Sequence, residues 1–392
     1  MGADAIRRGY GCAVDRTAPL DGILVADFSR ILAGPLAAQT LGDLGADVVK
    51  VEAPGGDDTR GWGPPFAADG TATYAMAANR NKRSVVLDLR DDGDRRLARE
   101  LARRADVVIA NLKPGAMERF GLGYEDLAAE DPRLVYCAIN GFGSGAGAPM
   151  PGYDPLVQAV GGLMSVTGAE GGDPAKVGVA LVDVIAGLNA TVGILAALRE
   201  RDRSGHGQMV EITLLGTVLA ALANQATGFL NAGVVPRALG TRHPSIEPFA
   251  TYACADGPLM ICAGNDRQFR ALAGVVGQPE LADDPRFATN ADRVEHHAAL
   301  RPLLERALAR EDRATWEARL NEAGVPAGPV NDLAGAFGLA DALGLDVVDD
   351  HGGVRTPASP IGLYDTPPVT RRPPPGLDEH GDAIRAWLRG PR

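Results

Sequence analysis

Two apolar runs separated by one short helix near the beginning of the sequence set the strongest limit on the fold. Residues 23–28 (ILVADF) and 46–51 (ADVVKV) are rich in aliphatic residues, as buried strands are. Between them, residues 33–45 (AGPLAAQTLGDLG) have helical spacing and small residues at their start. Two strands joined by a helix are typical of a parallel sheet, because the helix returns the chain to the same end of the sheet. The sequence therefore predicts a parallel α/β fold.

The same alternation continues along the first half of the chain. A helix is predicted over residues 91–105, where an acidic start is followed by regularly spaced apolar residues. Further elements are predicted as strands over 84–89, 106–110, 134–139 and 208–213 and as a long apolar helix over 214–230. Parallel strands with helices between them are typical of a doubly wound sheet, so we expect an open, Rossmann-like large domain.

The pattern changes after residues 233–249, a segment without clear periodicity. Two short apolar runs then flank the turn Asp256-Gly257, and helices follow, which is typical of an α+β domain. A chain of 392 residues is long enough for two domains. We predict a smaller domain inserted into the larger one, with these limits: large domain 19–224, small α+β domain with its linker 225–330, and return to the large domain over 331–392.

Charge and cysteine content exclude several classes of function. The net charge of −11 argues against a nucleic-acid partner, because phosphate binding needs a basic face. The four cysteines form no CxxC pair and the six histidines show no metal-ligand spacing, so we expect reduced thiols and no metal. Neither a signal peptide nor an uninterrupted apolar run of membrane-spanning length occurs, which predicts a cytoplasmic protein without a membrane partner.

One acidic residue, Asp183, lies where a short apolar run passes into a long helix of small and aliphatic residues. Residues 177–182 (VGVALV) are predicted to form a buried strand, and a long helix follows, with Asp183 at the junction. Aspartate is a preferred N-cap residue, and the helix dipole favours its ionised form. Local spacing therefore favours a helix cap over a catalytic group. Asp154, followed by Pro155, is predicted to cap another helix in the same way.

Other catalytic patterns do not fit the sequence. No GxSxG or Walker A motif occurs. Residues 141–146 fit a dinucleotide-binding pattern, but prolines follow where that motif requires a helix. The remaining possibility is catalysis by a carboxylate. The candidates are Asp154, Asp183 and Asp266, which lie at the ends of predicted helices and strands.

An ordered series of short motifs begins with residues 20–60 and covers nearly the whole chain from there on. Its other members are 79–84 (NRNKRS), 111–115 (NLKPG), 152–154 (GYD), Asp183, 205–210 (GHGQMV), 264–269 (GNDRQF) and 324–330 (GVPAGPV). This series resembles the family III CoA-transferases. The resemblance implies an enzyme that moves CoA from an acyl-CoA donor to a small carboxylic acid.

The resemblance assigns the catalytic role to Asp183. In transferases similar to this chain, the aspartate carboxylate attacks the thioester, CoA thiolate leaves, and a mixed anhydride forms on the enzyme. CoA then gives an aspartyl-CoA thioester, and the acceptor acid departs as the new acyl-CoA. The CoA thioester is thus a substrate, and no permanently bound cofactor is implied.

The same resemblance implies a set of CoA contacts. They are Ile31, Ala33, Leu87, Arg90, Asn111, Leu112 and Arg119. Arg90 and Arg119 would bind the phosphates of the nucleotide, with a solvated helix face as the alternative. Leu32 and Ala53 replace a glutamine and an arginine of the formyl-CoA transferases. These differences argue against formyl or oxalate specificity and leave one phosphate contact without a counterpart.

Tyr74 and Tyr153 match tyrosines near the substrate in the transferase branch. The racemases of the superfamily carry histidine at the position of Tyr153, and racemisation needs a base and an acid on opposite faces of the α-carbon. Tyrosine, with an ordinary pKa of about 10, does not readily replace that histidine. An acyl-CoA racemase or epimerase is therefore the second hypothesis, and a non-catalytic CoA-binding protein is the third.

Two further features follow from the resemblance. It implies a homodimer whose two chains interlace. Residues 239–244 (LGTRHP) replace the tetraglycine loop of formyl-CoA transferase, and Arg242 and His243 within them either face an anionic acceptor or cap the next element.

Overall fold

The computed structural model describes residues 18–391, and a parallel sheet organises the first part of them. Its six strands lie in the order β3-β2-β1-β4-β5-β6, which is the order of a Rossmann fold. Val25 of the central β1 lies opposite Val48 of β2 and Val107 of β4. The predicted open parallel sheet is confirmed. The strands are β1 Leu24–Asp27, β2 Asp47–Glu52, β3 Lys82–Val86, β4 Val107–Ala110, β5 Val135–Asn140 and β6 Met209–Thr213.

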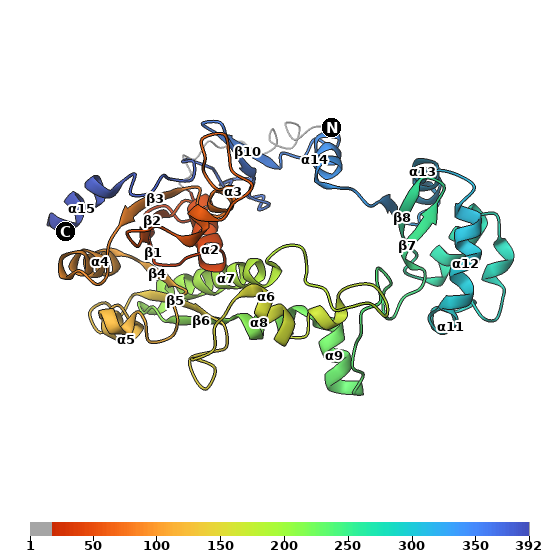
Figure 1. Ribbon diagram of the computed structural model, residues 1–392, viewed down its shortest axis with the longest axis horizontal. Helices are drawn as coiled ribbons and strands as arrows, with labels where there is room; N and C mark the ends of the chain where they lie inside the picture. Colours follow the sequence, from red (N-terminus) through yellow and green to blue (C-terminus); the bar gives the residue numbers. More distant parts are fainter. Residues whose placement is uncertain (1–17, 392) are drawn as a thin grey trace. The chain divides into compact units, whose positions relative to one another are not determined.

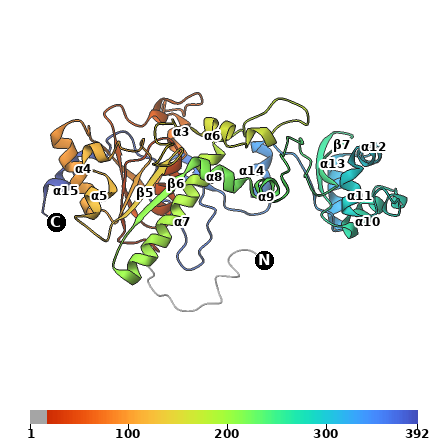
Figure 2. The same ribbon diagram turned by 90° about the horizontal axis from the view of Figure 1, so that it is seen from below.

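Helices cover both faces of this sheet (Figures 1 and 2). Helices α2 (Ala33–Asp43) and α7 (Leu181–Ser204) pack together on one face, and α4 (Asp92–Arg104) and α15 (Gly381–Arg389) pack together on the other. The last helix of the chain thus completes a core begun by the first strands. The other elements here are η1 Asp58–Gly61, α3 Thr73–Met76, η2 Glu118–Phe120, α5 Tyr124–Ala128, α6 Asp154–Val160, and the hairpin β10 Val348–His351 and β11 Val354–Pro357.

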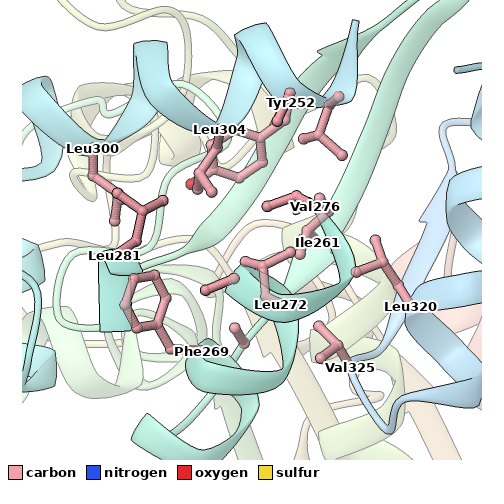
Figure 3. Close-up of a cluster of buried hydrophobic side chains, with 14 of the residues drawn as sticks. Tyr252, Ile261, Phe269, Leu272, Val276, Leu281, Leu300, Leu304, Leu320 and Val325 are labelled. Carbon is pink, nitrogen blue, oxygen red and sulfur yellow. The ribbon is translucent and has the colours of Figure 1, made fainter. Parts of the chain in front are cut away.

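A second core forms around a three-stranded antiparallel sheet. Tyr252 and Ile261 on the sheet pack against Phe269, Leu272 and other side chains of the surrounding helices (Figure 3). The predicted hairpin of two strands is present, and a third strand that was not predicted joins it. The elements are η3 Met164–Val166, β7 Phe249–Cys254, β8 Gly257–Cys262, α10 Asp266–Val275, η4 Pro279–Ala282, α11 Asn290–Glu295, α12 His297–Leu308, α13 Arg313–Glu322, β9 Ala327–Pro329 and α14 Leu333–Ala342.

Contacts divide the chain into two compact units. Of the described residues, the first comprises those up to Gly162, Gly178–Thr227 and those from Asp346 onward, and the second comprises Leu163–Val177 and Gly228–Leu345. This division groups residues 163–177 and 331–345 with the smaller unit, whereas the sequence-based limits placed them in the large domain.

Two predicted elements differ from the structure. Residues 177–182 form no strand: α7 already begins at Leu181, and Val179 before it is exposed. An apolar run of this length does not distinguish a strand from the first turn of a helix. The helix predicted over 214–230 is instead two helices, α8 Leu214–Ala221 and α9 Ala223–Ala232, separated where Ala223 adopts a φ of 41°.

Helix α7 is the one helix in the described part of the chain that is long and apolar enough to cross a membrane. In the structure one face of this helix belongs to the core, whereas Leu188 and Val192 on another face are exposed. Ala186, Ala190, Ile194 and Ala197 are buried at helical spacing. At Gly187 a β-carbon would lie only 2.7 Å from the carbonyl oxygen of Ala33, so glycine permits α7 to lie close against α2.

Candidate active site

A cavity opens where the strand order of the large sheet reverses. The chain leaves β1 toward α2 on one face and leaves β4 toward α5 on the other, which creates the crevice where doubly wound proteins bind ligands. The cavity has a volume of about 410 Å³. It is lined mainly by Arg30, Ile31, Leu32, Ala33, residues 111–114, residues 139–141, residues 150–153, Asp183 and Leu214.

A second cavity of about 380 Å³ is formed by the segments after β1, β2 and β3. Its wall includes Ser29, Arg30, Lys50, Ala53, Asp57, residues 87–90, Leu112 and Phe120. Arg30 and Leu112 belong to the walls of both cavities.

Asp183 lies in the first turn of α7 and lines the first cavity. The prediction that it caps the helix is wrong, because Ala180 occupies the N-cap position. Within residues 18–391, no hydrogen bond to the Asp183 carboxylate is found. Burial, and then the negative charge of Asp154, raise the pKa of Asp183 from 3.8 to about 7. Burial and the charge of Asp154 thus oppose the helix dipole, which was expected to favour the ionised form of Asp183.

Asp154 occupies the helix terminus that the sequence analysis assigned to Asp183. Its Oδ2 accepts hydrogen bonds from the backbone N–H of Val182 at 2.8 Å and of Asp183 at 3.1 Å. Gln158 Nε2 donates to its Oδ1 at 2.5 Å. The predicted cap of α6 by Asp154 is wrong, because Tyr153 takes that position. The free N–H groups at the start of α7 are therefore used by Asp154 and not by the side chain of Asp183.

The turn after β1 is held in an unusual conformation. Ile31 has a φ of 68°, which a β-branched residue rarely adopts and which costs roughly 1–2 kcal/mol. Its N–H donates to both carboxylate oxygens of Asp57, at 3.1 and 3.3 Å. Asn111 binds the preceding residue, Arg30, at both backbone groups: its Oδ1 accepts from the N–H at 2.8 Å, and its Nδ2 donates to the carbonyl at 2.7 Å.

The structure brings most of the predicted CoA contacts to the two cavities. Ile31, Ala33, Asn111 and Leu112 line the first, and Leu87, Arg90 and Leu112 line the second. Arg119 lines neither cavity and is exposed. Arg90 is also exposed and pairs with Asp88 at 2.9 Å. Whether any of these residues contacts CoA stays a prediction.

The two predicted tyrosines differ in position. Tyr153 lines the first cavity and is 52% exposed. Tyr74 lines neither cavity, and its ring packs edge-on against Trp62 with the centroids 5.3 Å apart. Burial raises the pKa of Tyr74, and the nearby charge of Asp183 raises it further.

Three residues of the site were not predicted: Arg30, Lys113 and Asp57. Arg30 and Lys113 line the first cavity, and Arg30 pairs with Asp58 at 2.9 Å. The position of Arg30 directly after the first strand and of Lys113 within NLKPG could have indicated them, since ligands bind at the carboxyl ends of such strands. No local pattern marks Asp57, because its contacts come from the turn after another strand.

Arg242 and His243 have partners within the smaller unit. Arg242 pairs with Glu170 at 3.1 Å, and the His243 ring packs against Phe249 while its Nδ1 accepts the N–H of Ser245. Among the described residues, no group of three acidic, histidine or cysteine side chains is arranged to hold a metal ion.

The family model described as CoA-transferase family III matches this chain over residues 20–381. The chain belongs to CoA-transferase family III. The transferase is 43% identical to succinate–glutarate CoA-transferase of Agrobacterium fabrum, over 95% of this chain and 96% of that protein. It is 41% identical to acetyl-CoA:oxalate CoA-transferase of Acetobacter aceti, again over 95% and 96% of the two chains.

Solved structures agree with this assignment. A CaiB/BaiF family protein from Brucella suis is 44% identical to the transferase, and the comparison covers 95% of this chain and all of the other with a TM-score of 0.86. Rv3272 from Mycobacterium tuberculosis is 32% identical and covers 94% of this chain and 99% of its own, with a TM-score of 0.85. The chain is a CoA-transferase.

Proposed function

We propose that Asp183 is the nucleophile of this CoA-transferase. One carboxylate oxygen attacks the carbonyl carbon of the donor acyl-CoA, the carbon–sulfur bond breaks, and its electron pair leaves with sulfur as CoA thiolate. The thiolate attacks the aspartyl carbon of the anhydride, which releases the donor acid and forms an aspartyl-CoA thioester. The acceptor carboxylate displaces the thiolate, and the thiolate then attacks the acceptor's carbonyl, which frees Asp183.

The observation that carries this proposal is the state of Asp183 itself. Its carboxylate lines the cavity at the switch point of the sheet and has no hydrogen-bond donor among the described residues, so its oxygens are available to a thioester. The raised pKa means a more basic carboxylate, which is a better nucleophile once it is ionised.

The two cavities divide naturally between the parts of an acyl-CoA. We assign the thioester and acyl group to the cavity that contains Asp183, and the nucleotide end to the second cavity. Arg30 and Arg90 in the wall of the second cavity can neutralise phosphates, and Arg30 can supply the contact that Ala53 lacks. The CoA contacts carried over from the family fit this division except at Arg119.

The acids that this enzyme exchanges are proposed to be dicarboxylic. The relatives named above use succinate, glutarate or oxalate. We expect succinyl-CoA as an effective donor and glutarate among the acceptors. The interlaced homodimer and the cytoplasmic location stay predictions.

The test is a panel of reactions followed by chromatography of the CoA thioesters. Succinyl-CoA and acetyl-CoA are each incubated with glutarate, oxalate and monocarboxylic controls, and a new thioester is expected with a dicarboxylic acceptor. Borohydride or hydroxylamine treatment during turnover should modify Asp183, which mass spectrometry of the peptide detects. Exchange of the α-hydrogen of a 2-methylacyl-CoA with deuterated water, without any transfer, would instead establish the racemase hypothesis.

A further inference from the structure

We propose that Asp57 is a positioning residue for CoA binding, which acts by holding the strained turn at Ile31 in place. The inference rests on the proposed function, because it assigns CoA to the cavities that this turn separates. Asp57 does not act as a ligand of CoA itself.

Every polar backbone group of the turn from Ser29 N to Ile31 N is bound by a side chain. Asp27 accepts the N–H of Ser29 at 2.9 Å, and Lys50 Nζ donates to the Ser29 carbonyl at 3.0 Å. Asn111 binds both backbone groups of Arg30, and Asp57 accepts the N–H of Ile31. Four side chains from four different segments therefore determine the path of three residues.

Such a set of contacts is what a strained residue needs in order to persist. Dinucleotide-binding proteins of this topology use glycine in the turn after the first strand, because glycine adopts positive φ freely. This chain carries Ile31 there instead, at a φ of 68°. A β-branched residue keeps that conformation only when its surroundings over-determine it.

Asp57 is itself rigidly held and shielded from solvent. Its side chain is 2% exposed, and Lys50 Nζ donates to its Oδ2 at 2.9 Å. Thr59 donates to its Oδ1 from the backbone at 3.1 Å and from the hydroxyl at 2.9 Å. Burial alone would raise the pKa of Asp57, but the Lys50 charge and the Thr59 hydrogen bonds lower it to about 2, so the group is ionised at neutral pH. Asp57 also lines the second cavity, but its oxygens are occupied by Lys50, Thr59 and Ile31, so we assign its effect on CoA to the turn.

The turn contributes to the walls of both cavities, so its conformation affects the acyl part and the nucleotide part of the bound substrate. Ile31 lines the cavity of Asp183, and Arg30 lines both cavities. If Ile31 relaxed to a negative φ, the peptide groups of Arg30 and Leu32 would rotate and the walls of both cavities would change. Preorganisation of such a loop lowers the entropic cost of binding, so its loss raises the dissociation constant and the KM more than it lowers kcat.

The test compares CoA binding by calorimetry in the full-length wild type, Asp57→Ala and the matched control Asp43→Ala. Asp43 is equally buried and equally ion-paired, through Arg80 at 2.6 Å, but lies outside both cavities. Asp57→Ala is expected to raise the Kd for CoA and the KM for acyl-CoA about tenfold with a much smaller change in kcat. Asp43→Ala is expected to unfold at a lower temperature with the Kd unchanged.

A rescue experiment separates positioning from general destabilisation. Adding Ile31→Gly to Asp57→Ala should recover much of the affinity, because glycine adopts a positive φ without steric cost when the Asp57 contact is absent. Ile31→Gly alone gives the reference, since it measures what loss of the Ile31 side chain costs in the cavity wall. A purely structural role for Asp57 predicts no recovery. If Asp57→Ala does not fold, Asp57→Ala with Lys50→Met removes the charge that would be left unpaired, and Lys50→Met alone is then the reference in both measurements, because Lys50 also binds the Ser29 carbonyl.

The outcomes distinguish this inference from the proposed function. A folded Asp57 variant with the Kd of the wild type, or a Kd that Ile31→Gly does not improve, overturns the positioning role and leaves CoA transfer intact. A wild type that binds CoA but transfers it to no acid overturns the proposed function, while the Kd values still decide the role of Asp57. A wild type that does not bind CoA overturns both.

Discussion

Asp43, which is buried, and Asp183, which is half-buried, are two carboxylates of the same structural unit, and their surroundings are opposite. Asp43 accepts hydrogen bonds from Arg80 Nε at 2.9 Å, Arg80 Nη2 at 2.6 Å and Asn81 Nδ2 at 2.7 Å. Asp183 has no donor among residues 18–391 and faces the negative charge of Asp154. Burial with donors makes a carboxylate part of the framework, whereas burial without donors leaves it basic and reactive.

The residues around Asp43 show what a buried carboxylate with hydrogen-bond donors does for the fold. Asn81 also donates to the carbonyl of Val369 and accepts the N–H of Arg371, and Arg371 donates to the carbonyls of Gly42 and Ala46. The NRNKRS segment therefore fastens the C-terminal part of the chain to α2 and β2. Its side chains serve the fold, although the segment contributed to the resemblance as strongly as the site did.

The largest expected effect is on activity, and it tests the reactive carboxylate, Asp183. Asp183→Ala should lower the transfer rate at least about 10³-fold, because removal of a nucleophile abolishes the covalent route. Asp43→Asn should retain the kcat of the wild type. Thioester chromatography measures both rates, and an active Asp183→Ala enzyme would show that the nucleophile lies elsewhere.

The next largest expected effect is on the free energy of unfolding, and it tests the structural carboxylate, Asp43. Arg80→Met leaves Asp43 buried without its main partner and should lower the free energy of unfolding by about 3–5 kcal/mol. The side chains of Arg80 and Asp43 are 6% and 4% exposed, so solvent cannot compensate. Urea unfolding followed by circular dichroism measures the change. A loss below about 1 kcal/mol would mean that Arg80 and Asp43 do not form a buried ion pair in solution.

Asp183→Asn should raise the free energy of unfolding, whereas Arg80→Met lowers it. The pKa of Asp183 is raised from 3.8 in the unfolded chain to about 7 in the folded one, so its contribution to stability is full below pH 3.8 and is lost as the pH rises through 7. Removal of the ionised group at pH 8 should therefore stabilise the inactive variant, on the order of 1–2 kcal/mol. The comparison requires thermal unfolding of both proteins at pH 5 and pH 8; a gain that is the same at both values would contradict it.

The smallest effect concerns the pH dependence of catalysis. For the wild type, kcat/KM for acyl-CoA should fall as the pH drops below about 7, because the free enzyme then carries a protonated Asp183. Asp154→Asn should move this midpoint to lower pH, since it removes the second cause of the raised pKa while an amide oxygen can still accept the N–H groups of α7. Burial is the larger cause, so the midpoint should stay above the ordinary range of aspartate. An unchanged midpoint would show that Asp154 does not influence Asp183 electrostatically.

The order of elements and the class of the enzyme follow from the amino-acid sequence alone. Alternating apolar strands and helices are local patterns, so the parallel sheet and the antiparallel hairpin after residue 249 could be predicted without any knowledge of contacts. The series of motifs from residue 20 onward was enough to identify the family and to point to Asp183, Ile31 and Asn111.

Tertiary structure decided how those residues are used. Asp154, 29 positions before Asp183 in the chain, takes the helix terminus that local spacing assigned to Asp183, and burial then raises the pKa that the helix dipole was expected to lower. Asp57, 26 positions after Ile31, holds a backbone conformation that isoleucine avoids in isolation. Hydrogen bonds between distant segments and the removal of water from a carboxylate depend on the packed chain, and no spacing within a single segment encodes them.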